Sequence, residues 1–399
     1  MIEGFRVRNY RVLRDVSIGR LWQQPKVQPL GRLTAVIGKN GCGKSTLFDA
    51  FGFLSDCLAT DVEQACDLKQ RGGFDRLLSQ GSAGSIEFEI YFRPKPDHRP
   101  ITYELAIGRD ENGRPIIEYE RLRQRRRGQS KGQPFSFLNL KRGQGEAWAG
   151  VSSGADEEQA DKVAVHLRNP RQLAIGTYGA LQEHPRIAAF RDFLQGWYIS
   201  YFAPDAARSL PLAGPQRHLN IHGDNLANVV QFMEREQPLR FQEILDTIAK
   251  KIPGIGRIST KRSDDGRLLL QFNDQGFADP FFAQQMSDGT LKVFAYLLLL
   301  ADPEPPSFIG IEEPENGLYH KLLAALVGEF RLQQRSQIFL TTHQPFLVDE
   351  LDPEETWILE KGVDGYSTIR KASDDLIVKN LVAEGLPLGG LWFSDYLDR

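Results

Sequence analysis

Cysteine, histidine and long apolar runs are all scarce in this 399-residue chain. The three cysteines, at positions 42, 57 and 66, form no CxxC pair and no even framework. This excludes a disulfide-stapled fold and suits a reducing compartment. The seven histidines are scattered without the spacing of zinc ligands. The longest strongly apolar segment, Val293–Ala301, is too short to cross a bilayer, and the first residues carry no signal-peptide pattern. We therefore expect a cytoplasmic protein without membrane contact.

An excess of charge of either sign is also absent, since the net charge is −3. The whole chain thus gives no argument for nucleic acid, and any such signal must be local. With 41% apolar and 25% charged residues, the composition is that of a globular protein. The length allows one large domain or two ordinary ones.

A glycine-rich segment is the clearest positive signal. It follows the apolar run 33–37 and precedes a helix-like segment over 47–58. Its spacing, glycine, four residues and then Gly-Lys-Ser, is that of a P-loop. Such a loop turns backbone N–H groups towards phosphates, its lysine reaches the β- and γ-phosphates, and its serine ligates Mg²⁺. The predicted nucleotide-binding residues are Gly38, Lys39, Asn40, Gly41, Cys42, Gly43, Lys44, Ser45 and Thr46.

Two adjacent carboxylates, Glu312 and Glu313, end the apolar strand predicted over 308–311. Neighbouring side chains on a strand point to opposite sides, so one carboxylate can join a metal shell while the other faces water. We predict that Glu312 binds Mg²⁺ and that Glu313 polarises the attacking water. An acidic loop after a buried strand is the plainer alternative.

Two further signals lie in the same half of the chain. Ser287 and Gly289 open an apolar helix predicted over 290–300, and they form either a simple N-cap or a site for a γ-phosphate. His343 follows a strand predicted over 337–340. Ligands of open α/β sheets bind at such strand ends, so His343 can sense the γ-phosphate or orient water. A structural histidine is the alternative.

Taken in order, the P-loop, the Ser-x-Gly helix, the Glu-Glu strand and the Thr-His strand resemble the ABC-type ATPase head of the SMC and RecF group. The nearest resemblance is to the AAA_21-like predicted bacterial ATPases, and it runs over nearly the whole chain. It implies that Ser287 and Gly289 form a signature motif that meets ATP on a second protomer, in a head-to-tail homodimer. It also implies that Glu313 is the catalytic glutamate, Glu312 the Walker B carboxylate and His343 the switch histidine. Arg11 is implied to lie near the phosphates, and Gln172 and Gln182 are candidates for the Q-loop glutamine.

The expected fold class is α/β, a P-loop NTPase with a two-lobed, SMC-head-like fold. Alternating strands over 86–92, 101–107 and 116–122 predict an antiparallel β-rich lobe. We divide the single head into an N-terminal lobe (1–165), a helical and hairpin insertion (166–286) and a C-terminal α/β lobe (287–399). Glycine and proline interrupt the chain between the P-loop and Ser287, so no long coiled coil is expected.

A basic stretch, defined as residues 121–142, contains eight cations and no acid. A solvated hairpin tip is the plain interpretation, and contact with a DNA or RNA backbone is the alternative. The glycine- and serine-rich segment 143–154 and the segment 204–215 are expected to be loops. The cations are Arg121, Arg123, Arg125, Arg126, Arg127, Lys131, Lys141 and Arg142.

The function that these features predict is ATP hydrolysis by an ATP-sandwiched dimer that drives an effector protein or a nucleic-acid process. The resemblance suggests DNA maintenance or anti-phage defence, with the effector encoded separately and no nuclease after residue 371. An ATP-dependent clamp with little hydrolysis is the alternative. The ATPase subunit of a transporter fits less well, because segment 286–290 departs from the Leu-Ser-Gly-Gly-Gln signature.

Overall fold

The structure is a computed structural model that describes residues 1–126, 132–148, 162–251, 255–274, 276–394 and 396–397. Two compact units make up the chain. The first contains residues 1–197, 352–386 and 394–399, and the second contains residues 198–351 and 387–393. Each unit therefore combines segments that are distant in sequence. The three-part division at 165 and 286 stays a prediction.

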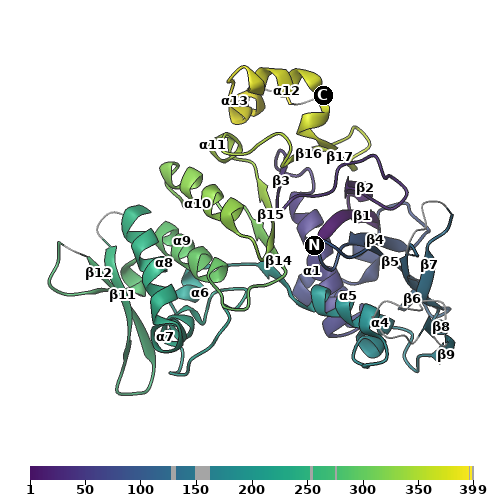
Figure 1. Cartoon of the computed structure of the whole chain (residues 1–399), viewed down its shortest axis with the longest axis horizontal. Helices are drawn as coiled ribbons and strands as arrows, with labels where there is room; N and C mark the ends of the chain where they lie inside the picture. Colours follow the sequence, from purple (N-terminus) through teal and green to yellow (C-terminus); the bar gives the residue numbers. More distant parts are fainter. Residues whose placement is uncertain (127–131, 149–161, 252–254, 275, 395, 398–399) are drawn as a thin grey trace. The chain divides into compact units, whose positions relative to one another are not determined.

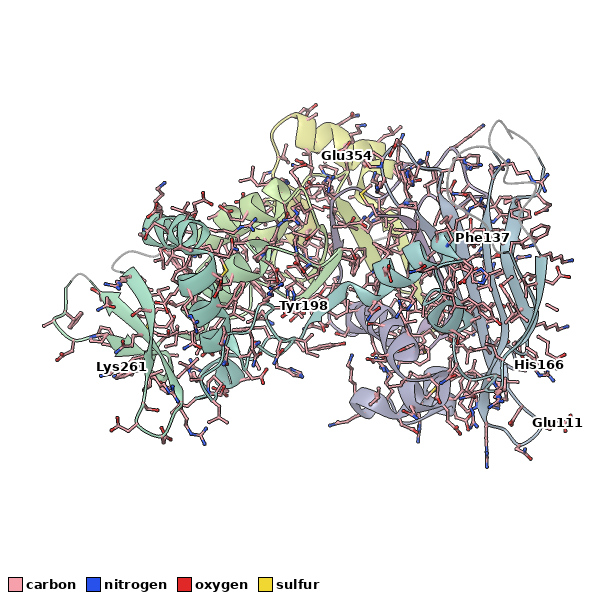
Figure 2. The ribbon with its side chains drawn as sticks, turned by 60° about the horizontal axis from the view of Figure 1, so that its bottom comes forward. Glu111, Phe137, His166, Tyr198, Lys261 and Glu354 are labelled. Atoms are coloured by element: carbon pink, nitrogen blue, oxygen red, sulfur yellow. The ribbon has the colours of Figure 1, made fainter. Side chains whose placement is uncertain are left out.

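The first unit is built on an antiparallel sheet, ordered β2-β1-β4-β5-β6-β7-β8-β9 in the described part of the chain (Figure 1). In β4, four large apolar side chains are buried and those between them are half-buried, as the sequence alternation predicts. The turn that carries Glu111 joins β5 to β6 at one end of the sheet (Figure 2). The strands are β1 (Ile2–Tyr10), β2 (Leu13–Gly19), β4 (Ile86–Phe92), β5 (Ile101–Arg109), β6 (Pro115–Gln124), β7 (Phe135–Lys141), β8 (Gln144–Trp148) and β9 (Lys162–His166).

Helix α1 (Lys44–Ala59) packs its aromatic residues against this sheet. The Phe5 and Phe51 rings stack at a centroid distance of 4.2 Å, and Phe53 lies 6.0 Å from Phe88. Burying each of these side chains contributes about 1.5–3 kcal/mol. The core therefore fixes α1, and with it the glycine-rich segment at its N-terminus. The other helices of this unit are α2 (Val62–Asp67), α3 (Phe74–Leu77), α4 (Ala174–Tyr178), α5 (Pro185–Gln195) and α12 (Leu376–Ala383), with short 3₁₀ turns at Leu68–Gln70 and Ala372–Asp374.

A second group of strands in the first unit leads into the glycine-rich segment. β3 (Leu33–Ile37) is buried at every residue and pairs in parallel with β16 (Thr356–Lys361). β16 pairs in turn with β17 (Ser367–Lys371) in antiparallel. Since residues 356–371 lie far from β3 in sequence, this pairing was not visible in the local pattern.

The second unit has helix α9 (Asp288–Leu300) in its core, with apolar residues buried around most of its circumference. Phe294 of α9 packs on Phe272, and Tyr296 packs on Phe330. The parallel pair β14 (Phe308–Glu312) and β15 (Gln337–Thr342) carries the two predicted catalytic strand ends. The other elements are β10 (Trp197–Ser200), which begins at the last residue of the first unit, α6 (Pro204–Ala207), α7 (Leu226–Glu236), α8 (Pro238–Lys251), β11 (Ile255–Arg262), β12 (Leu268–Asp274), β13 (Phe281–Phe282), the 3₁₀ turn Ala283–Gln285, α10 (Lys321–Leu332), α11 (Pro345–Val348) and α13 (Leu388–Phe393).

The α/β class with an antiparallel lobe is confirmed. Among the described residues the longest helix is α1 with 16 residues, which is too short for a long coiled-coil arm. Two loop predictions were wrong. Residues 204–207 form α6, and residues 144–148 form β8, which pairs with β7 and β9. The rest of the predicted loop, 149–154, lies outside the described residues.

Candidate functional site

The P-loop closes around the side chain of Lys44. Its Nζ donates to the carbonyl oxygen of Gly38 at 2.8 Å and to that of Lys39 at 3.3 Å, and the side chain is buried. Gly41 and Gly43 have φ angles of +80° and +108°, which L side chains rarely adopt. The loop thus has the curled shape of an anion nest, with a cation at its centre.

The neighbouring strands of the first unit hold this loop in place. Ser367 of β17 donates its hydroxyl to the Cys42 carbonyl at 2.6 Å. A Cβ atom added to Gly38 would lie 2.5 Å from the Leu359 carbonyl oxygen, so this position has no room for a side chain. Lys39, Asn40, Gly41 and Ser45 are exposed. The rim of the loop is therefore open to a ligand while its base is packed.

Behind the loop, Asp49 joins three parts of the first unit. It lies one turn after Ser45 in α1, and it accepts bonds from the Tyr10 hydroxyl at 2.7 Å and from Arg71 Nε at 2.8 Å. Arg11 Nη1 lies 3.3 Å from Asp49 Oδ2. Burial alone would lower the pKa of the Arg71 guanidinium, but Asp49 and its other acidic neighbours raise it overall. Arg11, expected near the phosphates, thus lies beside the P-loop helix.

In the second unit, Glu313 and His343 form a direct pair. Glu313 Oε1 lies 2.8 Å from His343 Nδ1, and Asn316 donates its amide to Oε2 at 2.8 Å. The register explains the contact, because β14 and β15 run in parallel with Glu312 opposite Thr341. The residues that follow each strand therefore emerge side by side. Glu312 is half-buried at the end of β14.

The backbone of Glu313 is itself unusual. Its φ angle is +45°, a region that non-glycine residues seldom occupy. The N–H of Glu313 donates to the Thr341 carbonyl at 3.0 Å, which ties this conformation to β15. Strained backbone of this kind is concentrated at functional sites, because the surrounding structure must maintain it.

Ser287 is the N-cap of α9 and accepts a bond from the Thr290 N–H at 3.2 Å. The residue is exposed, so it does not point into the core of its own unit. Gly289 is buried, and a Cβ atom there would lie 2.5 Å from the Gly317 carbonyl oxygen. The Ser-x-Gly motif is therefore packed directly on the loop that follows Glu313.

Comparison with known proteins identifies the family. A sequence profile described as "AAA domain, putative AbiEii toxin, Type IV TA system" (AAA_21) matches residues 33–349, well over half of the chain. The chain belongs to the AAA_21 family. The phosphate import ATP-binding protein PstB of Parasynechococcus marenigrum (strain WH8102) is 33% identical over 91 residues, 21% of this chain and 32% of that protein. The match thus covers about a third of that relative's length.

Solved SMC head structures share the fold. An SmcHead bound to the C-winged helix domain of ScpA has a TM-score of 0.56 at 15% identity, over 92% of this chain and 97% of that chain. An Smc head domain with an extended coiled coil, bound to the C-terminal domain of ScpA derived from Pyrococcus furiosus, has a TM-score of 0.52 at 12% identity, over 96% of this chain and 99% of that one. This member of the AAA_21 family thus has the fold of an SMC head.

One residue of this AAA_21 protein was missed by the sequence reasoning. Lys292 of α9 is 7% exposed, and its Nζ donates to the Glu313 carbonyl at 3.2 Å and to the Asn316 carbonyl at 3.0 Å. Burial lowers the pKa of this lysine, although nearby carboxylates oppose the shift. Lys292 is the only charged residue between Gly289 and Leu300, and this isolation was the signal in the sequence.

Glu315, next to this lysine in the second unit, is a buried carboxylate. Its Oε1 accepts from the Thr342 hydroxyl at 2.6 Å, whereas Oε2 is buried without a hydrogen-bond partner in the described part of the structure. Burial raises the pKa of Glu315, in part offset by the Thr342 bond. The loop after Glu313 is therefore joined to β15 by Glu315 and to α9 by Lys292.

Two arginines of the basic stretch form ion pairs inside the first unit. Arg121 Nε and Arg123 Nη2 donate to the Glu104 carboxylate at 2.6 and 2.5 Å, and Arg123 is buried. Both cations are thus paired with one carboxylate within the sheet. Arg127 and Lys131 lie outside the described residues. A nucleic-acid contact at this stretch would have to use its other members.

The P-loop belongs to the first unit, and Ser287, Glu312, Glu313 and His343 belong to the second. Within the described ranges, no cluster of three or more His, Cys, Asp or Glu side chains is arranged to hold a metal ion. The described helices also include none with the length and apolarity needed to cross a membrane.

Proposed function

We propose that this AAA_21 protein binds ATP at its P-loop and hydrolyses it in a dimer that sandwiches two nucleotides. The observation that carries hydrolysis is the Glu313–His343 pair, at 2.8 Å, on a backbone held at positive φ. Lys44 and the loop N–H groups would hold the phosphates. The family membership and the shape of the loop support ATP as the ligand.

Mg²⁺ fits the donor atoms that the chain offers. The Ser45 hydroxyl and the Glu312 carboxylate are hard oxygen ligands, which Mg²⁺ prefers. Ser45 is exposed at the first turn of α1, beside the open rim of the P-loop. In the proposal these two side chains hold the ion, which neutralises charge on the phosphate oxygens when bound.

Glu313 would act as the general base for the attacking water. Its carboxylate would accept a proton as the water attacks the γ-phosphate, and His343, which follows β15, would orient the carboxylate. Lys44 stabilises the charge that develops on the phosphate oxygens. Ser287 would complete the site from the second protomer, a role that its exposed N-cap position supports.

Replacing Glu313 with Gln tests this proposal. The amide cannot accept the proton, so we expect kcat to fall at least about 100-fold while ATP binding persists. Phosphate release and light scattering with ATP measure turnover and dimer mass, and the variant should accumulate as a dimer. Glu384→Gln, an exposed change in the first unit, is the matched control. A Glu313→Gln variant with wild-type turnover would overturn the assignment, and a protein that retains ATP binding after Lys44→Ala would overturn the P-loop site.

A clamp with little hydrolysis is the second candidate, and one observation favours it. Both carboxylate oxygens of Glu313 are engaged, one by His343 and one by Asn316. These bonds compete with an attacking water for the lone pairs of the carboxylate. If the wild-type dimer forms with ATP but releases phosphate no faster than Glu313→Gln, the clamp is the correct description.

We further propose that ATP-dependent closure drives a separately encoded effector or a nucleic-acid process, in DNA maintenance or anti-phage defence in the cytoplasm. The family description, with its putative toxin and toxin–antitoxin terms, supports a defence role. The SMC heads of similar fold are bound to ScpA, which supports a protein partner for this chain.

The hypothesis that the basic stretch contacts nucleic acid can be tested through its remaining cations. In a variant with Arg125, Arg126 and Arg127 changed to Ala, the salt slope of DNA binding should fall by about three, one per lost phosphate contact. Arg257, Lys261 and Arg262 of β11 are exposed, and their triple alanine variant is the charge-matched control. An equal slope in wild type and in the first variant would reject DNA contact at this stretch.

A further inference from the structure

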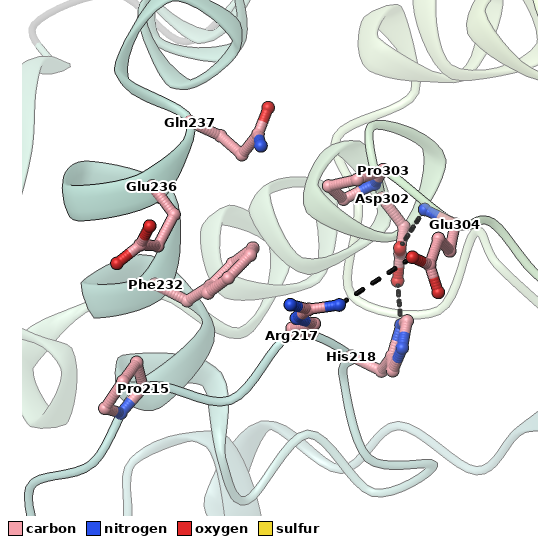
Figure 3. Close-up of a pocket in the computed structure, with 9 residues that line it drawn as sticks. All are labelled: Pro215, Arg217, His218, Phe232, Glu236, Gln237, Asp302, Pro303 and Glu304. Carbon is pink, nitrogen blue, oxygen red and sulfur yellow. Dashed lines mark hydrogen bonds and ion pairs between the residues drawn. The ribbon is translucent and has the colours of Figure 1, made fainter.

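The second unit contains a cavity that the proposed ATPase mechanism does not use. Its volume is about 500 Å³, within the range of about 300–1,000 Å³ typical of ligand sites. It lies between the end of α7, the loop around residue 217 and the segment that follows α9 (Figure 3). The lining residues are Pro215, Arg217, His218, Phe232, Glu236, Gln237, Asp302, Pro303 and Glu304.

Acidic groups outnumber basic ones in this lining. Glu236, Asp302 and Glu304 contribute carboxylates, whereas Arg217 is the one permanent cation among the nine residues. Helices α7 and α9 also end here, at Glu236 and Leu300, and the C-terminus of a helix carries partial negative charge. The cavity therefore favours a cationic guest.

In the cavity lining, the Asp302 carboxylate is held in place by its contacts, whereas the Arg217–Glu304 pair is exposed (Figure 3). Asp302 is buried, accepts from the Glu304 N–H at 2.8 Å and lies 2.8 Å from His218 Nδ1. Its carboxylate thus shapes the loop. Arg217 and Glu304 are only 3.7 Å apart, with side chains 65% and 70% exposed. Such exposed pairs contribute little stability and exchange partners readily.

Arg217 indicates what kind of cation the cavity accepts. Its guanidinium carbon lies 5.9 Å from the centre of the Phe232 ring, within reach of a cation–π contact. A guest guanidinium can take the same place between the Phe232 ring and Glu304, since its planar fork both stacks and binds a carboxylate through two hydrogen bonds. The Gln237 amide can donate to and accept from a peptide group beside it.

We propose that this cavity binds an arginine side chain in a basic peptide segment of a protein partner. The guest guanidinium displaces Arg217 from Glu304 and pairs with that carboxylate. The site lies wholly within the second unit and does not depend on ATP hydrolysis. A test of peptide binding is therefore independent of a test of the proposed function.

The probe is the peptide acetyl-Gly-Arg-Gly-amide, added to the full chain and followed by saturation-transfer NMR and calorimetry. The matched peptide contains citrulline, which keeps the shape of arginine without its charge. We expect the citrulline peptide to bind at least about tenfold more weakly, because the carboxylate then loses its ionic partner.

Two variants give opposite expectations. Glu304→Gln should weaken arginine-peptide binding about tenfold. Arg217→Ala should leave binding unchanged or strengthen it, because the competing cation is gone. Glu243→Gln, an exposed change on α8, is the control and should bind as wild type does.

Each other outcome overturns the proposal. Loss of binding in Arg217→Ala, with Glu304→Gln unaffected, would show that Glu304 is not the partner of the guest guanidinium. Equal binding of the arginine and citrulline peptides would show that charge is not recognised. Displacement of the peptide by equimolar spermidine would identify a polyamine site in place of a peptide site. Absence of any arginine-peptide signal would reject the site.

Discussion

At the residue scale, Lys292 connects the start of α9 to the catalytic glutamate of the proposed mechanism. Its two bonds fix the carbonyls of Glu313 and Asn316, and hence the carboxylate above them. Lys292→Met keeps the length of the side chain but removes the donor. We expect kcat to fall about tenfold to 100-fold, because Glu313 loses its orientation. KM for ATP should stay nearly unchanged, because the nucleotide site itself is not altered.

The control for this prediction is Lys321→Met, at the exposed start of α10. Lys292→Arg, which keeps a cationic donor, should restore part of the activity. If Lys292→Met turns over ATP at the wild-type rate, or raises KM alone, the lysine is a purely structural residue. Steady-state kinetics at saturating Mg²⁺ measure both parameters.

At the scale of elements, Asp49 holds α1, the turn after β1 and the segment around Arg71 together. Arg71 is 2% exposed, and its Nη1 also donates to Asp56 at 2.7 Å. Asp49→Asn removes a charge that compensates this buried cation. We expect the free energy of unfolding to fall by about 1–3 kcal/mol, since Asp56 alone then compensates the buried cation.

Urea denaturation measures this loss, with Asp364→Asn as the control. Asp364 pairs with Arg14 at 3.5 Å between two side chains that are more than half exposed, so its change should cost less than about 1 kcal/mol. An equal loss of unfolding free energy in the two variants would show that Asp49 stabilises the fold no more than an exposed ion pair does.

The elements also show how far sequence reasoning reaches. The P-loop context and the strands 86–92 and 101–107 follow from local patterns, and the structure contains them. α6 has four residues, too few for a helical period, and β8 is a strand because β7 and β9 pair with it. Both depend on neighbours that a local window does not include.

The candidate site likewise has features that local sequence predicts and features that depend on distant partners. Residue types and spacing predict Lys44, Ser45, Glu313 and His343 as site residues. The contact between Glu313 and His343 follows from the register of β14 and β15, which no single segment encodes. The positive φ of Glu313 and the bonds of Lys292 are likewise tertiary, because their partners come from other elements.

At the scale of the whole molecule, one buried carboxylate in the first unit makes stability depend on pH. Glu120 of β6 is fully buried and accepts the N–H groups of Ala174 and Ile175 at 2.6 and 3.0 Å. Burial raises its pKa from the ordinary 4.5 to about 7, against the lowering effect of these bonds. The folded chain therefore holds a proton here that the unfolded chain has already released between pH 4.5 and 7.

This raised pKa stabilises the fold below pH 4.5, and the contribution is lost as the pH rises towards 7. The loss is about 3 kcal/mol, at about 1.4 kcal/mol per pKa unit. Glu120→Gln keeps an acceptor for one N–H but does not titrate. The free energy of unfolding of the variant, relative to wild type, should therefore rise by about 2–3 kcal/mol between pH 5 and pH 8.

Urea titrations followed by tryptophan fluorescence report mainly on this unit, which holds four of the five tryptophans, Trp22, Trp148, Trp197 and Trp357. Parallel pH profiles for the two proteins would contradict the assignment, because other titrating groups are common to both and only Glu120 differs.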